Sequence, residues 1–590
     1  MIHKNLKMMN MAFGFAPKWV ILTFIQNLCT ELGAVFTSVM VVEIVYSGII
    51  GILPYNKVCI YIVAISMFIF GNCLINSVYY GKFYETGIQM IRDSISFLIN
   101  NKTANVDIAL FQDIEFQNIH SLVQEDFPKK VIEIVQYMAF YLSNVLAIIL
   151  CLIISATISF HTVILGCLVI PLLIVISNKK KFYNRIIAKN RSEYRKRKEY
   201  YVDVFSKKEY VEEIRLYPFI DIFKKEMHSI SESLRTKVKK NNKKMFVLDL
   251  VNQGILEIGV YWGIILYLSF NVIEKTYPVS YLLPTAAVVF QLIKRANAVI
   301  GIGPILKDYA ESENFYEKFM SASAEVENQQ GEVLDGNIEQ IDIVDLSFRY
   351  HESGVLVLDH VNMKIAKGQK IALVGENGAG KTTLMRILLG LYNNYTGSVF
   401  INGIELRNLD KKSYRLKTSH ILQFFHIYAC SLNENVMLGD ETGKKAKTET
   451  KLEKALMDAD LYDEIIERYK NPNPFLTKEF TEDGVELSGG QKQKLAIARA
   501  YYKDAGIIFM DEPSSALDPL SEARIFDKIN VLTENKLLLV VSHRLYTIRN
   551  VDWTYYLEKG RVVEQGTHES LMQLKGRYEK MYTAQGERFA

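Results

Sequence analysis

Residues 375–382 have the types and spacing of a phosphate-binding loop, reading G-x-x-x-x-G-K-T. In this pattern the glycines let backbone N–H groups approach phosphate oxygens, and the start of the following helix adds partial positive charge. We expect the Lys381 ammonium to reach the β- and γ-phosphates and the Thr382 hydroxyl to bind Mg²⁺. The pattern alone predicts binding of a nucleoside triphosphate and leaves the reaction open.

Two runs of residues flank this loop and are expected to position it. Residues 371–374 are the apolar sequence Ile-Ala-Leu-Val, which is typical of a buried strand, and residues 384–389 favour a helix. The loop is therefore predicted to join a core strand to a helix N-terminus, which is the context in which this motif binds phosphate.

Two acidic residues stand at the end of a second apolar run. Asp511 and Glu512 follow the predicted buried strand 507–510. An acid at that place suits Mg²⁺ coordination, and the next acid is placed to polarise an attacking water. His543 follows another predicted strand, 537–541. A lone histidine after a strand is more often structural, but this one is expected at the sheet edge where doubly wound sheets bind ligands.

The order of these elements predicts the class of the C-terminal fold. Apolar, strand-like runs alternate with helical runs from about residue 340 onward. This alternation is typical of an α/β domain with a largely parallel sheet.

Residues 487–491 read L-S-G-G-Q, and with this motif the second half of the chain resembles the nucleotide-binding domain of an ATP-binding cassette (ABC) transporter. The motifs follow one another in the order and at the spacing of that family. The resemblance implies an ATPase that uses ATP and Mg²⁺. It implies ATP-binding roles for Tyr350, Gly375, Glu376, Asn377, Gly378, Ala379, Gly380, Lys381, Thr382 and Thr383. It implies catalytic roles for Glu512, His543 and Gln423, and Mg²⁺ contacts for Thr382, Gln423 and Asp511. It implies that the ATP of a partner chain is contacted by Ser488, Gly489, Gly490, Gln491 and Asp518.

Long apolar runs in the first half of the chain predict a membrane domain. Six membrane-spanning helices are expected, at residues 19–45, 58–80, two within 131–176 with a tight turn near 159–162, 246–270 and 279–304. The loop at residues 177–245 holds 21 Lys and Arg against 9 Asp and Glu. Because basic residues accumulate on the cytoplasmic side of membrane proteins, the long loops are assigned to the cytoplasm.

The basic runs in these loops have two interpretations. Runs such as 179–181 and 195–198 occur on nucleic-acid-binding surfaces and also on solvated faces of helices that continue out of a bilayer. The second interpretation is favoured because a membrane protein needs such residues on its cytoplasmic side and because the net charge of the chain is only +4. We therefore expect no nucleic-acid partner. The six cysteines form no C-x-x-C pattern, so neither a zinc site nor a disulfide framework is supported.

These features predict a multidomain membrane protein, with an all-α transmembrane domain of six helices followed by an α/β P-loop NTPase domain of the ABC type. Residues 1–320 are assigned to the transmembrane domain with its long cytoplasmic extensions, 321–336 to a linker and 337–590 to the nucleotide-binding domain. This organisation resembles an exporter-type half-transporter, nearest to bacterial peptide and bacteriocin exporters. Residues 107–116 and 208–217 are similar to the segments that couple the two domains in that family.

The resemblance also implies a location, a partner and an activity. We expect a multi-pass protein of the cell membrane, in contact with membrane lipids, with a cytoplasmic nucleotide-binding domain. Because ATP lies between two cassettes in this family, a dimer is implied. A homodimer is favoured, since Glu512, His543 and an intact 488–491 motif occur together, and a heterodimer stays open. The expected activity is ATP-driven export of a peptide or amphipathic substrate by alternating access.

Other activities stay open at the level of sequence. A multidrug or lipid exporter, an importer, and an ATP-gated channel or sensor are all compatible with the same domains. A soluble cassette ATPase that transports nothing is disfavoured by the six predicted spans.

Two acidic residues within the predicted spans are candidates for substrate contact. Glu31 lies mid-way along the first span and Glu257 mid-way along the fifth, each among other polar residues. Charges inside a bilayer are costly and usually face a cavity or a partner. One interpretation is a translocation cavity with acidic walls, which favours a cationic or amphipathic substrate. The other is a structural ion pair with Lys294 or Arg295 of the sixth span.

Overall fold

A computed structural model describes most of the chain, and it divides into two compact units. The described residues are 1–49, 54–158, 171, 174–176, 178–180, 182–183, 200–216, 220–274, 279, 282–322, 331–350, 354–423, 425–438, 445–512, 524, 527–529, 533, 536–542, 549 and 551–586. The helical unit comprises Met1–Ala104 and Asn118–Ala322. The α/β unit comprises Ser323–Ala590 together with the distant segment Asn105–Gln117. The domain boundaries predicted from the sequence stay a prediction, because 323–330 of the expected linker lies outside the described residues.

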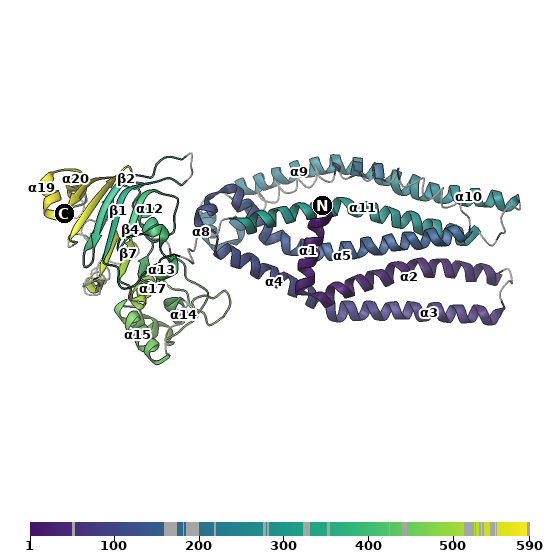
Figure 1. Ribbon diagram of the computed structural model, residues 1–590, viewed down its shortest axis with the longest axis horizontal. Helices are drawn as coiled ribbons and strands as arrows, with labels where there is room; N and C mark the ends of the chain where they lie inside the picture. The colour runs from purple at the N-terminus through teal and green to yellow at the C-terminus, as the bar shows by residue number, and fades with distance from the viewer. Residues whose placement is uncertain are drawn as a thin grey trace. The chain divides into compact units, whose positions relative to one another are not determined.

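The helical unit consists mainly of long helices that run side by side, together with several shorter helices (Figure 1). They are α1 (Ile2–Phe15), α2 (Pro17–Ile49), α3 (Tyr55–Val78), the π-helix η1 (Tyr79–Tyr84), α4 (Glu85–Ala104), α5 (Ile114–Ile158), α8 (Lys208–Leu216), α9 (Ile220–Asp249), the π-helix η3 (Leu250–Gly259), α10 (Val260–Ile273) and α11 (Leu282–Ser321). Helix α1 crosses the long helices and is tied to α11, since the Asn5 side chain donates to the Leu306 carbonyl at 2.9 Å.

Four helices are long and apolar enough to cross a membrane among the described residues: Pro17–Val42, Tyr55–Ala104, Ile114–Ala156 and Leu282–Ser321. They contain most of the predicted first, second, third and sixth spans. The shorter apolar helix Tyr261–Ile273 lies at the predicted fifth span. Most of the predicted fourth span, and the turn expected near 159–162, lie outside the described residues.

Large apolar side chains on these helices point outward. Ile60, Phe70 and Leu266 are 64%, 64% and 69% exposed. Apolar surface exposed on this scale is unfavourable in water but matches the hydrocarbon core of a bilayer. The outer surface of the helical unit is therefore suited to lipid.

Two sheets form the α/β unit. The smaller sheet is antiparallel, in the order β2-β1-β4-β5, with β1 (Gln340–Phe348), β2 (Leu358–Ala366), β4 (Thr396–Ile401) and β5 (Ile404–Glu405). The larger sheet has the order β10-β9-β3-β8-β7-β6, with β3 (Lys370–Gly375), β6 (Thr418–Ile421), β7 (Ile507–Asp511), β8 (Leu537–Val541), β9 (Trp553–Glu558) and β10 (Arg561–Gly566). All its strands are parallel except β10, which confirms the predicted α/β class with a largely parallel sheet.

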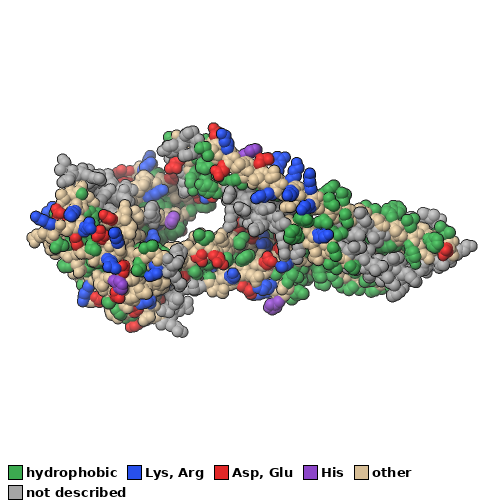
Figure 2. All heavy atoms as spheres, turned by 90° about the horizontal axis from the view of Figure 1, so that it is seen from above, with side chains coloured by type: hydrophobic (Ala, Val, Ile, Leu, Met, Phe, Trp, Pro, Cys, Tyr) green, Lys and Arg blue, Asp and Glu red, His purple; other side chains and the backbone are tan. Residues whose placement is uncertain are grey.

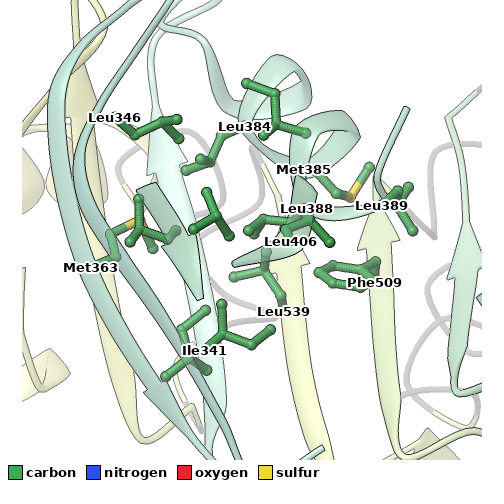
Figure 3. Packing of buried hydrophobic residues seen from close by; sticks show 14 of the residues in the cluster. Ile341, Leu346, Met363, Leu384, Met385, Leu388, Leu389, Leu406, Phe509 and Leu539 are labelled. Carbon is green, nitrogen blue, oxygen red and sulfur yellow. The ribbon is translucent and has the colours of Figure 1, made fainter. Parts of the chain in front are cut away.

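The α/β unit also contains short helices. They are α12 (Lys381–Leu388), α13 (Lys411–Leu416), α14 (Leu432–Met437), α15 (Lys445–Asp458), α16 (Tyr462–Tyr469), α17 (Gly489–Lys503), α19 (His568–Leu574) and α20 (Arg577–Gly586), with the 3-10 turns η2 (Ile108–Gln112) and η5 (Leu406–Asn408). Helix α12 packs into a fully buried core between the sheets, where Leu384 and Leu388 contact the cluster that contains Ile341, Phe509 and Leu539 (Figure 3). This core fixes the start of α12 relative to the ends of β3 and β7.

Candidate nucleotide-binding site

The loop 375–382 connects strand β3 to helix α12, as the sequence predicts. Gly375 has φ of +143°, and a Cβ added there would lie 2.1 Å from the Leu557 carbonyl oxygen of the adjacent strand β9. Gly380, directly before α12, has φ of +101°. Both positions need glycine, because a side chain would be strained or would clash. The loop is therefore held in a conformation that other residues cannot adopt easily.

Lys381 is the first residue of α12 and is only 5% exposed. Its ammonium donates hydrogen bonds to the carbonyl oxygens of Gly375 and Glu376, each at 2.8 Å. Burial lowers the pKa of Lys381, while the nearby carboxylates of Glu512 and Asp511 act in the opposite direction. The Lys381 side chain is thus held by the loop backbone, and the residue lines the cavity described next.

A cavity of about 810 Å³ lies over this loop. Most of the residues assigned to ATP from the sequence line it, together with one that sequence reasoning missed. The lining residues are Tyr350, Val357, Asn377, Gly378, Ala379, Gly380, Lys381, Thr382, Thr383, Gln423 and Glu512. The volume is in the range typical of small-molecule sites, roughly 300–1,000 Å³. Val357 has no sequence signal, and its N–H donates to the Phe348 carbonyl at 2.8 Å, a contact that no local motif indicates.

Tyr350 is held at the edge of this cavity by two kinds of contact. Its hydroxyl lies 2.8 Å from the Thr383 hydroxyl of α12. Its ring packs edge-on against Phe348 and Tyr392, with centroids 5.1 and 5.7 Å apart. A fixed aromatic ring beside a phosphate-binding loop is able to stack on a base.

Two of the predicted catalytic residues, Gln423 and Glu512, line the same cavity and contact each other. The Gln423 amide donates to the Glu512 carboxylate at 2.9 Å. Glu512 has φ of 49° and its N–H donates to the Val541 carbonyl of β8 at 2.9 Å, so its backbone is fixed in a conformation that is uncommon for this residue type. Such strain is typical of functional positions.

Asp511 ends strand β7 and is 2% exposed. Burial raises the pKa of Asp511, and a hydrogen bond with the Thr382 side chain acts against this shift. A carboxylate, a hydroxyl and the nearby Gln423 amide are oxygen donors of the kind that Mg²⁺ takes in phosphate sites. The residues present therefore fit the metal that the sequence predicts.

The L-S-G-G-Q motif lies at the start of α17. Ser488 is the N-cap, and its side chain accepts a hydrogen bond from the Gln491 N–H at 3.3 Å. The Gln491 side chain in turn accepts from the Ser488 N–H at 3.1 Å, which completes a capping box. The structure describes all four residues 488–491, and none of them lines the cavity over the loop. His543 and Asp518 lie outside the described residues.

The first predicted coupling segment belongs to the α/β unit. Asp107 caps the turn η2 by accepting the Ala109 N–H at 2.9 Å. The Gln112 side chain donates to the Tyr392 hydroxyl at 2.9 Å, and Ala109 packs against the core of this unit. Because Tyr392 also contacts Tyr350, segment 107–116 is linked to the wall of the cavity. Residues 208–216 of the second segment form α8 in the helical unit.

Of the two acidic residues within predicted spans, Glu31 has an ion-pair partner. Its carboxylate pairs with Arg295 of α11, which is 4% exposed. Arg295 also donates to the Asn144 side chain at 3.2 Å and to the Glu31 carbonyl at 3.4 Å. The structure thus places Glu31 in an ion pair with Arg295. This is the second of the two interpretations offered by the sequence, the first being contact with the substrate. The side chain of Glu257 lies outside the described residues.

Comparisons with known proteins identify the domain and the fold. Residues 358–515 match the family model described as ABC transporter. A solved structure described as a bacterial Atm1-family ABC exporter with ATP bound matches with a TM-score of 0.81 over 96% of this chain and 98% of that chain. The sequence identity is 18%, so this likeness establishes the fold.

Relatives by sequence carry names of several transport systems. The subtilin transport ATP-binding protein SpaT of Bacillus subtilis is 36% identical over 248 residues, which are 41% of this chain and 39% of that protein. The beta-(1-->2)glucan export ATP-binding/permease protein NdvA of Rhizobium johnstonii is 32% identical over 306 residues, 50% of this chain and 51% of that protein. The ABC multidrug transporter mdr1 of Aspergillus fumigatus is 36% identical over 259 residues, 44% of this chain and 19% of that protein. The matched part is therefore about half or less of each relative.

Proposed function

We propose that this chain, a multi-pass membrane protein with the fold of an ABC exporter and an ABC transporter domain, is one half of an ATP-driven exporter with its ATP-binding domain in the cytoplasm. The observation that carries the proposal is the cavity over loop 375–382, which brings Lys381 and Thr382 of α12 together with Gln423 and Glu512. A site with a fixed cation, oxygen ligands and a carboxylate suits hydrolysis of a nucleoside triphosphate.

In this proposal the loop binds the phosphates of ATP. The Lys381 ammonium exchanges its hydrogen bonds with the Gly375 and Glu376 carbonyls for the β- and γ-phosphate oxygens. Backbone N–H groups at the start of α12 supply further donors. Tyr350 stacks on the adenine ring. Thr382, Gln423 and Asp511 would hold Mg²⁺, which would neutralise negative charge on the phosphates.

Hydrolysis uses Glu512 as the base. The Gln423 amide, 2.9 Å from the Glu512 carboxylate, holds that carboxylate toward the γ-phosphate. Glu512 polarises a water whose oxygen attacks the γ-phosphorus, and the proton of that water passes to the carboxylate. The bond from the γ-phosphorus to the bridging oxygen breaks, leaving ADP and phosphate. We propose that His543 stabilises the transferred phosphoryl group.

The position of residues 488–491 supports a dimer. They form the N-terminus of a helix, where backbone N–H groups favour an anion, yet they do not line the cavity of their own chain. We propose that they, with Asp518, complete the cavity of a second copy, so that ATP joins two cassettes. A homodimer is proposed, because this chain carries both halves of a complete site.

Closure of the two cassettes is proposed to drive transport. Segment 107–116 joins helices α4 and α5 of the membrane domain and is bonded to the α/β unit through Gln112 and Tyr392. Movement of the cassette therefore pulls directly on two long helices. This is the kind of rigid-body coupling that converts an inward-facing cavity into an outward-facing one.

The proposed cargo is a peptide or amphipathic molecule, in line with the subtilin transport protein among the relatives. A multidrug substrate is the second candidate, because a multidrug transporter is also among them. The test is ATP-dependent uptake of each candidate into inside-out vesicles that contain the chain. Uptake that needs hydrolysable ATP supports export. ATPase activity without accumulation of any substrate against a gradient would favour a channel or sensor instead.

A further inference from the structure

A second cavity lies within the helical unit, in a different part of the chain from the nucleotide cavity. Its volume is about 820 Å³, and it is formed by residues between 175 and 183 and by the C-terminal part of α9. Three of its nine described lining residues are lysines, namely Lys179, Lys243 and Lys244, and none of the nine is acidic. The cavity therefore presents positive charge from two helical segments to one space.

The same cavity has an apolar side. Val175, Val247 and Leu248 line it, and these residues belong to the ends of the spans predicted at 131–176 and 246–270. The lysines follow the first of these spans and precede the second. The cavity thus lies where two predicted spans leave the bilayer on the cytoplasmic side. Figure 2 shows Lys and Arg side chains gathered on the helical unit beside its hydrophobic part.

Aromatic rings and a nearby ion pair add to this arrangement. Phe182 and Tyr183 line the cavity, and tyrosine is enriched at the membrane–water interface. The Lys244 ammonium lies 5.3 Å from the centroid of the Tyr183 ring, so its position is partly fixed. Asp249, the acid that ends α9, pairs with Lys180, which does not line the cavity. The charge of the three lining lysines is therefore not neutralised by that carboxylate.

The sequence of α9 extends the positive charge beyond the cavity. Between residues 233 and 248 the chain has six basic residues and no acidic one. A basic segment beside a membrane is attracted to anionic lipids by roughly 1 kcal/mol for each Lys or Arg near the surface. A nucleic acid or a free phosphate ion would bind the lysines, but neither would account for the apolar residues that line the cavity.

We propose that this cavity binds the phosphate headgroup of an anionic phospholipid from the cytoplasmic leaflet. The phosphate lies between Lys179, Lys243 and Lys244, and an acyl chain lies along Val175, Val247 and Leu248. The site holds the ends of two spans together through the lipid, and it is independent of the ATP site.

The test measures lipid binding to the full chain by native mass spectrometry in detergent, with dioleoyl phosphatidylglycerol and dioleoyl phosphatidylcholine as probes. The double variant Lys243→Gln with Lys244→Gln should bind the first phosphatidylglycerol roughly 25-fold more weakly, which is about fivefold for each lysine removed. The matched control is Lys237→Gln with Lys239→Gln, which removes the same charge from the same helix outside the cavity. The variant Lys243→Arg with Lys244→Arg keeps the charge and should keep the binding.

Each outcome decides the proposal. Loss of phosphatidylglycerol binding in the first variant, with binding kept in the control and in the arginine variant, supports it. Equal loss in the first variant and the control would mean a diffuse electrostatic attraction and would overturn the cavity site. Equal affinity for the two lipids, or displacement of phosphatidylglycerol by millimolar inorganic phosphate, would overturn it too. Should the glutamine double variant fail to fold, the single variant Lys179→Gln, which removes a lining charge from the other segment, is compared with Lys237→Gln. Equal binding of phosphatidylglycerol by these two variants would overturn the cavity site.

Discussion

Replacement of Glu512 by glutamine is the sharpest test of the proposed chemistry. The change keeps the size of the side chain and removes only its ability to accept a proton. The hydrogen bond from the Gln423 amide, 2.9 Å long in the structure, is retained because the new amide oxygen is also an acceptor. The N–H of residue 512 still donates to Val541, so the uncommon backbone conformation is kept.

The expected effect follows from these contacts. Since the fold and the phosphate loop are untouched, the affinity for ATP should stay within about threefold, as for a substitution that removes no contact to the ligand. Turnover should fall by roughly 10²–10⁴-fold, the usual contribution of a general base. This corresponds to about 2.7–5.4 kcal/mol on the activation barrier.

The assay measures phosphate release by the purified chain in lipid nanodiscs, with ATP binding followed in parallel by thermal shift. The control is Glu558→Gln, which changes a carboxylate of β9 that pairs with Arg577 at 3.6 Å and does not line the nucleotide cavity. The control should keep the parent rate. If Glu512→Gln hydrolyses ATP within tenfold of the parent, the assignment of Glu512 as the base is wrong.

Four further changes test other parts of the reasoning. Lys381→Ala should weaken ATP binding by at least about tenfold, since a hydrogen bond to a charged group contributes roughly 1.5–3 kcal/mol. Titration with a fluorescent ATP analogue measures the affinity, and an unchanged affinity would contradict the proposed phosphate contact. Ser488→Ala should cost about 1 kcal/mol of stability through loss of the α17 cap and should also lower the ATPase activity of the dimer. Ser488→Asn should restore the stability but not the activity. Thermal unfolding measures the first effect and phosphate release the second. Tyr392→Phe removes the acceptor of the Gln112 bond and should lower substrate-stimulated ATPase. Basal ATPase should be nearly unchanged, because the ring that packs against Tyr350 is kept. Equal loss of both activities would point to damage to the cavity. Glu31→Gln should destabilise the helical unit by about 3–5 kcal/mol, because it leaves the buried Arg295 charge unpaired. Normal thermal stability together with lost transport would instead support a role of Glu31 in contact with the substrate.

The nucleotide site was largely predictable from the sequence because its chemistry is local. The glycines of residues 375–382, Lys381 and Thr382 lie within one turn between a strand and a helix, and their spacing alone defines the loop. Asp511 and Glu512 follow a short apolar run, and such a run is typical of a buried strand. Local patterns of this kind can be read from the sequence, because the strand, loop or helix that contains these residues also determines where they lie.

Contacts between distant segments were not predictable in the same way. The ion pair between Glu31 and Arg295 was one of two readings, since the sequence shows two charges in two spans but not which faces of the helices meet. Val357 lines the cavity although no local motif indicates it, and segment 105–117 joined the α/β unit across more than two hundred residues of chain. Packing decides such contacts, and packing depends on the whole surface of each element.

The sequence by itself determined that this protein has apolar spans, a phosphate-binding loop and an α/β domain, because hydrophobic periodicity and short motifs act within single elements. The tertiary structure alone decided which side chains share a space. It placed Gln423 against Glu512, linked Gln112 to Tyr392 and brought Lys179 to the same cavity as Lys243. The physical reason is that these pairs are joined only by the burial of the surfaces between them, and no local pattern encodes that burial.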